Sequence, residues 1–342
     1  MRIKWVPVFI LLACTFAGAQ KKPGPPVVTE KRAAPIFVFH TDEFWLNLHH
    51  FLYVLGRADN KTSDSSREAV AGVTVEQDKA LATLKPSDQA IWREAVVFYA
   101  ADLSKRDLVF DASLSSLTNA LAKAGDAPSL SSVRIDKDTA AMLERAAPTY
   151  RKAWWPMHHA ANRAWQASIE KLVAKYGNTI LVFITDAYKL EWPATGFPVN
   201  ISAYSNWAGA YSTTGNLLVL SSQSVGTQGD YGLETIFHEG MHQWDEQVIA
   251  ALRQQSRRVN KIVPQNLSHA LIFFTAGEAV RQVLPDHVPY AIKFGVWQRG
   301  IAPFKAALEE LWKPYLEKGG RRDDVFAEII GRVGVEPSDK AQ

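Results

Sequence analysis

The chain has 342 residues and a formal net charge of +3, and 47% of its residues are hydrophobic and 21% charged. This is the composition of an ordinary globular protein, and the length is sufficient for one large hydrophobic core or two smaller ones. These values exclude a disordered or fibrous chain, and the lack of a concentrated basic block argues against nucleic-acid binding. The single cysteine, Cys14, lies near the N-terminus, so the chain beyond it can form neither internal disulfides nor cysteine metal sites.

Residues 1–19 have the pattern of a secretory signal peptide. Arg2 and Lys4 precede an apolar run, and small residues suited to a cleavage site follow at 17–19. The sequence Leu-Leu-Ala-Cys that ends at Cys14 also resembles a bacterial lipoprotein box. We therefore expect an exported protein, either periplasmic or secreted, that is anchored to a membrane only if Cys14 is lipidated.

The next part of the chain changes from a linker to helices. Residues 20–40 are rich in proline, glycine and charge and are expected to form an extended linker. Helical periodicity then starts near Thr41 and defines a helical N-terminal region over residues 41–176. The last helix of this region should be kinked or broken at Pro148 and Pro156.

A small sheet is expected after this region. Three runs that are bounded by turn residues have the pattern of strands: 179–185, 201–211 and 216–221. The second and third are joined through a short connection suited to a hairpin. The helical pattern returns from Asp230 onwards. The fold class is therefore α+β and mostly helical, with a small mixed sheet in a second region that covers residues 177–340.

The chemistry of this chain centres on His238, Glu239 and His242, which form a His-Glu-x-x-His pattern within an expected helix. Residues four apart lie on one face of a helix, so the two imidazoles can bind one zinc ion. Glu239 is offset by one position, which suits a general base that acts on a metal-activated water. The alternative is an amphipathic helix with two satisfied core histidines and a surface glutamate.

The flanks of this pattern resemble those of the zincin metallopeptidases. That class prefers Thr or Val three residues before the first histidine, uncharged residues around the ligands and a hydrophobic residue two after the second histidine. The matching residues are Thr235, Ile236, Gly240, Met241, Gln243 and Trp244. The resemblance implies a zincin-like catalytic core with an active-site helix.

The third ligand separates the zincin subclasses. Metzincins need other residues than Asp245 and Val248 at those positions, whereas gluzincins take a glutamate from a later helix. A helix expected over 266–282 offers Glu278, which follows a dense apolar run and would be costly to bury unpaired. The chain thus resembles the gluzincins over about 179–290, with Glu278 as third ligand; the alternative role for Glu278 is an ion pair with Arg281.

The resemblance also implies supporting groups. An edge strand within 204–211 would pair with an extended substrate, and the alternative is an ordinary hairpin strand without that role. Tyr290 is the preferred donor to the developing oxyanion, with His287 and His269 as alternatives. His269 is nine positions before Glu278 and half a turn out of phase with it, which counts against His269.

Two other carboxylates lie near the expected ligands in sequence. Asp245 shares the ligand face of the helix and is expected to orient an imidazole. Glu234 is explained by the preference of acidic residues for a helix N-terminus.

The function expected from the sequence is zinc-dependent hydrolysis of a peptide or protein substrate. His238, His242 and Glu278 would hold the Zn²⁺, Glu239 would take the proton of the activated water, and Tyr290 would assist. Two alternatives stay open: a non-peptidase zinc hydrolase, and an exported binding or scaffold protein with a degenerate site.

Overall fold

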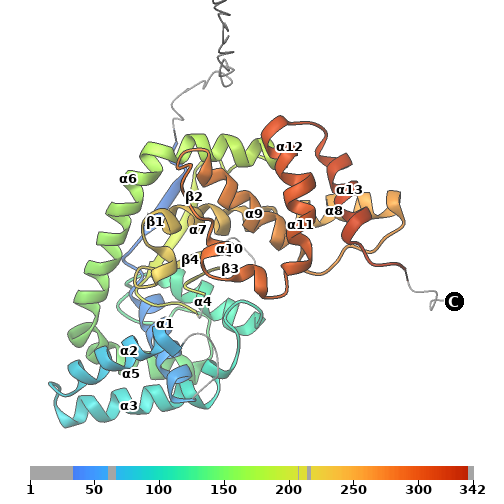
Figure 1. Ribbon diagram of the computed structural model, residues 1–342. Helices are drawn as coiled ribbons and strands as arrows, with labels where there is room; N and C mark the ends of the chain where they lie inside the picture. The colour runs from blue at the N-terminus through green and yellow to red at the C-terminus, as the bar shows by residue number, and fades with distance from the viewer. Residues whose placement is uncertain (1–33, 61–66, 207, 214–216, 338–342) are drawn as a thin grey trace, which may run out of the picture. The chain divides into compact units, whose positions relative to one another are not determined.

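The computed structural model describes residues 34–60, 67–206, 208–213 and 217–337 (Figure 1). The expected signal peptide, Cys14 and most of the expected linker lie outside these residues, so export and lipidation stay predictions. The described part is mostly helical and contains a small mixed sheet of four strands, which confirms the α+β class. None of its helices is long and apolar enough to cross a bilayer.

Six helices build the N-terminal region: α1 (Phe44–Asp59), α2 (Arg67–Leu81), α3 (Pro86–Ala101), α4 (Ala112–Ala124), α5 (Lys137–Ala153) and α6 (Trp155–Tyr188). The break between α5 and α6 falls at Trp154, two residues before Pro156, which lies in the first turn of α6. A proline is favourable there because a first-turn residue needs no backbone donor. At Pro148 the helix is not broken, since α5 continues through that residue.

The sheet has the order β1-β2-β4-β3, from β1 (Phe37–His40), β2 (Phe197–Ser202), β4 (Leu217–Ser221) and β3 (Ala210–Thr213). The first three strands are parallel, and β3 pairs antiparallel with β4 as the hairpin predicted from the sequence. Strand β1 lies in the expected linker, whose last residues are therefore part of the fold.

Two strand predictions need correction. Residues 179–185 are the last turns of α6. Ile180, Leu181 and Ile184 are buried there while Val182 is 64% exposed, a helical spacing that outweighs the strand preference of β-branched residues. Residues 201–211 are not one strand: their first two residues complete β2 and their last two begin β3.

The sheet separates two apolar cores. Tyr211, Leu217 and Val219 pack with the helices of the N-terminal region. The alternate residues Leu218 and Leu220 pack with the second half of α6 and with the helices that follow the sheet, as the two-residue period of a strand requires. These later helices are α7 (Gly229–Met241), α8 (Asp245–Val259), α9 (Leu267–Arg281), α10 (Tyr290–Lys293), α11 (Lys305–Ala307), α12 (Lys313–Lys318) and α13 (Arg322–Val333).

Candidate metal centre

Helix α7 carries the predicted motif and is buried from Gly232 to its end. Gly240 permits this close packing, because a Cβ at that position would lie only 2.4 Å from the ring of Trp192. Asp230 lies in the first turn, although the N-cap is Gln228 and makes no side-chain cap bond. The α-helix ends at Met241, and a short 3-10 turn, His242–Trp244, leads into α8.

His238 and His242 point one nitrogen each at a common position. Their Nε2 atoms lie 3.3 Å apart and their rings are inclined by 82°. Two nitrogens bound to one tetrahedral zinc at about 2.0–2.1 Å are separated by about 3.3–3.4 Å. The spacing of this pair therefore fits two ligands of a single ion.

The third member of the group is His269, in the first turns of α9. Nitrogen atoms of His238, His242 and His269 all lie within 4.8 Å of one another. The rings of the first two lie 5.3 Å and 5.1 Å from that of His269. Three imidazoles with room for one further ligand are a known donor set for catalytic zinc.

Glu278, the ligand predicted from the sequence, does not join this group. It pairs instead with Arg281 at 3.0 Å and with Lys313 at 3.8 Å. Glu278 lies nine positions after His269, which turns the two side chains to opposite faces of α9. The phase difference that counted against His269 in the sequence therefore applies to Glu278, because it is His269 that joins His238 and His242.

Asp245 orients one of the imidazoles, as the sequence predicts. Its Oδ2 lies 2.8 Å from Nδ1 of His242. A carboxylate at this nitrogen fixes the ring so that Nε2 remains free for a ligand. The corresponding Nδ1 of His238 is buried and has no partner among the described residues.

The surroundings set the charge of the three imidazoles. Burial and the neighbouring histidines lower the pKa of His238 well below its ordinary value, and burial with the charge of His242 lowers the pKa of His269 to about 4. Burial also acts to lower the pKa of His242, but the bond to Asp245 and the charges of Glu239 and Asp245 outweigh it and raise that pKa. His238 and His269 are thus neutral at pH 7, the form that binds metal.

Glu239 is a buried carboxylate beside this group. The Oγ atom of Ser212, in β3, lies 2.9 Å from both the Oε2 atom and the backbone oxygen of Glu239. Burial raises the pKa of Glu239, although His242 and Ser212 oppose the shift. A raised pKa brings a carboxylate closer to the value that suits proton transfer near neutral pH.

Strand β3, which supplies Ser212, is an edge strand of the sheet. The backbone oxygen of Gly209 accepts a bond of 2.8 Å from the amide of Ser221. In an antiparallel ladder the bonded positions alternate, so Ala210 and Ser212 direct their backbone groups away from β4. Of the expected range 204–211, the part that belongs to the edge strand starts at Ala210.

Phe273 and Tyr290 form an aromatic wall beside the histidines. The Phe273 ring lies 4.0 Å from that of His238 and 6.3 Å from that of Tyr290, onto which it stacks. Burial and the nearby charge of Glu239 raise the pKa of Tyr290 to about 12. Tyr290 therefore keeps its phenolic proton at neutral pH and can donate it in a hydrogen bond.

Glu234 holds the segment that carries Tyr290. Its Oε2 atom accepts from Nε2 of His287 at 2.6 Å and from the backbone amide of Tyr290 at 2.8 Å. Its side chain is 1% exposed and that of His287 is 2% exposed. The role of Glu234 is therefore to bind this segment, and not to stabilise a helix N-terminus. His287 is hydrogen-bonded to Glu234 as part of the same contact.

We expect Glu234→Ala to destabilise the fold, because two buried donors lose their acceptor at about 1–3 kcal/mol each. Urea unfolding measures the change. Asp230→Ala, an exposed acid in the first turn of the same helix, is the control and should cost less than about 1 kcal/mol. Equal losses in the two variants would contradict the role given to Glu234.

Comparison with protein-family models, curated proteins and solved structures found no match to this chain. The description of the site therefore rests on its own geometry. That geometry is a group of three histidines from α7, the turn that follows it and α9, with Glu239 beside the group and an edge strand in contact with Glu239.

Proposed function

We propose that this protein is a zinc-dependent hydrolase that cleaves peptide bonds. The observation that carries the proposal is the convergence of His238, His242 and His269 beside Glu239, a buried carboxylate that is not part of the histidine group. A structural site would use four protein ligands, whereas three ligands leave a position for chemistry.

The donor set favours zinc among the common metals. Imidazole ligands suit zinc, whereas Mg²⁺ and Ca²⁺ prefer oxygen ligands. Zinc held by these residues would supply a Lewis acid that lowers the pKa of water and polarises a carbonyl group. With His269 as third ligand, the resemblance to gluzincins covers the motif on α7 but not the glutamate ligand of that class.

Glu239 is the proposed general base. It takes a proton from the attacking water and passes it to the leaving amine. Ser212 restrains the carboxylate through Oε2 and leaves Oε1 free for this transfer.

Tyr290 is the proposed donor to the oxygen on which negative charge develops. Its hydroxyl remains protonated, and the charge of Glu239 is near enough to raise its pKa. A preorganised hydroxyl in a water-poor site stabilises such charge more than water would. Glu234 takes part only indirectly, by holding the backbone of Tyr290.

A peptide is the proposed substrate because of strand β3. Ala210 and Ser212 direct backbone donors and acceptors outward, and Ser212 also contacts Glu239. An extended peptide that pairs with this edge would be held beside the catalytic groups by main-chain hydrogen bonds. Esters and small amides lack the repeating backbone that this edge would bind.

Asp245→Asn should weaken zinc binding by about 10- to 100-fold, the usual effect of removing a group that orients a ligand. The amide still reaches His242 but no longer offers a charged acceptor. Competition with a chelator of known affinity measures the change. Glu246→Gln, an exposed neighbour, should bind zinc like the wild type; equal zinc affinity in Asp245→Asn would contradict the role of Asp245.

Metal analysis combined with a peptide-library digest tests the proposal. The wild type should contain one zinc per chain and cleave peptides, and ester and small-amide panels should react poorly. Zinc with ester but no peptide cleavage would favour a non-peptidase hydrolase. A protein without stoichiometric zinc would overturn the proposal and favour a binding protein.

A further inference from the structure

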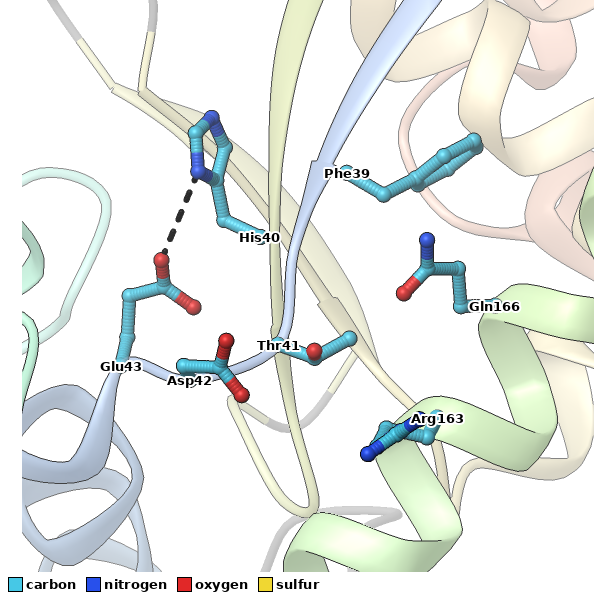
Figure 2. A pocket seen from close by; sticks show the side chains of 7 residues that line it. All are labelled: Phe39, His40, Thr41, Asp42, Glu43, Arg163 and Gln166. Carbon is cyan, nitrogen blue, oxygen red and sulfur yellow. Dashed lines mark ion pairs between the residues drawn. The ribbon is translucent and has the colours of Figure 1, made fainter.

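A cavity lies at the carboxyl end of strand β1, away from the metal centre. It has a volume of about 420 Å³, within the range of small-molecule sites. No residue of the metal centre lines it. The lining comes from β1, its connection to α1 and one stretch of α6 (Figure 2): Phe39, His40, Thr41, Asp42, Glu43, Arg163 and Gln166.

The environment of Glu43 is the observation that indicates a ligand. Its side chain is 10% exposed, and Oε1 lies 3.6 Å from Nδ1 of His40. The other oxygen, Oε2, is buried and has no hydrogen-bond partner among the described residues. Figure 2 shows this second oxygen turned towards the side of the cavity where Asp42 and Thr41 lie. Burying a carboxylate oxygen without a hydrogen-bond donor costs free energy. A ligand with an N–H group would supply the missing donor and lower that cost.

The opposite wall has the opposite charge. Arg163 and Gln166 project from α6 across the cavity from Glu43 and His40 (Figure 2). The side chain of Arg163 is exposed, and its guanidinium makes no ion pair with any residue that the structure describes. Asp42, which also lines the cavity, is 80% exposed and is bound to His159 at 2.6 Å. The cavity thus presents a buried acid on one side and an unpaired cation on the other.

A metal ion fits this lining less well. Within the part of the chain that the structure describes, the histidines of the metal centre are the group of side chains close enough to share one ion. The carboxylates of Asp42 and Glu43 do not converge with His40 in that way. The separation of charges across the cavity suits a ligand that itself carries two separated charges.

We propose that this cavity binds a small zwitterion of the amino-acid type, with its protonated amine on Glu43 and its carboxylate on Arg163. An ammonium group supplies the donors that Oε2 lacks, and a guanidinium binds a carboxylate through paired hydrogen bonds. Burial raises the pKa of Glu43 to about 7, and a bound ammonium would favour the ionised form. The proposal uses no residue of the metal centre and does not depend on the proposed function.

Calorimetric titration of the full protein with L-alanine tests this inference. Methylamine and acetate, which each carry one of the two charges, should bind at least about tenfold more weakly than L-alanine, as expected when one charged hydrogen bond is lost. Glu43→Gln and Arg163→Gln should each weaken L-alanine binding by about the same factor. Lys171→Gln, an exposed cation on the same helix, is the matched control and should have no effect.

Three outcomes would overturn the inference: no binding of L-alanine, binding that Arg163→Gln leaves unchanged, or methylamine binding as tightly as L-alanine. Thermal unfolding of Glu43→Gln shows whether that variant remains folded; if it does not, the Arg163→Gln result and the two single-charge probes decide. Zinc content should stay the same in every variant, which separates this test from that of the hydrolase.

Discussion

Glu239→Gln should retain one zinc per chain and lose hydrolysis by about 10²- to 10⁴-fold, the usual contribution of a positioned general base. Glutamine preserves the size of the side chain and can still accept from Ser212, so the fold and the histidine group should persist. It cannot take a proton from water. The measurement pairs metal analysis with the rate of peptide cleavage by wild type and variant.

Glu246→Gln controls for the loss of one negative charge near the site. Glu246 is exposed on α8, and its replacement should change the rate less than about twofold, as for a surface group without a specific partner. Full activity in Glu239→Gln would exclude Glu239 as the base. Loss of zinc along with activity would instead make Glu239 part of the metal site.

The second prediction with a large expected effect is a change in zinc affinity that distinguishes the two candidates for the third ligand. His269→Ala should lower zinc affinity by about 100-fold or more, since a site with four ligands contributes roughly 10–16 kcal/mol and each ligand on the order of 3 kcal/mol. Glu278→Gln should keep zinc, because Glu278 is paired with Arg281 and Lys313. Both residues lie on α9, so each variant is the control for the other.

Titration of metal-free protein with zinc in the presence of a competing chelator measures both affinities. The reverse result, with zinc lost in Glu278→Gln and kept in His269→Ala, would restore the ligand set predicted from the sequence. Retention of full affinity in both variants would exclude both residues as the third ligand. His238→Ala, which removes a ligand common to both sets, should lose zinc in either case.

Local pattern was sufficient for the helix that bears the site. The spacing of His238 and His242 places both on one face whatever surrounds them, and their Nε2 atoms lie 3.3 Å apart. The bond from Asp245 to His242 follows from the same helical spacing. Both of these contacts depend only on spacing within one short stretch of the chain.

Predictions that depend on two elements were less reliable. The choice between His269 and Glu278 requires the rotation of α9 relative to α7, and both faces of α9 are buried. Amphipathicity, the usual guide to rotation, is weak in such a helix. The 179–185 run failed for a related reason, because its residues favour strands while packing made it the end of α6.

The sequence by itself determined the α+β class, the helix with His238, Glu239 and His242, and the β3–β4 hairpin, because each depends on spacing within a short stretch. The tertiary structure alone decided that His269 faces this pair, that Ser212 contacts Glu239 and that Glu234 holds Tyr290. It also decided that β1 belongs to the sheet and that Glu43 and Arg163 share a cavity. These contacts join residues far apart in the chain, and their geometry depends on how whole elements pack rather than on local periodicity.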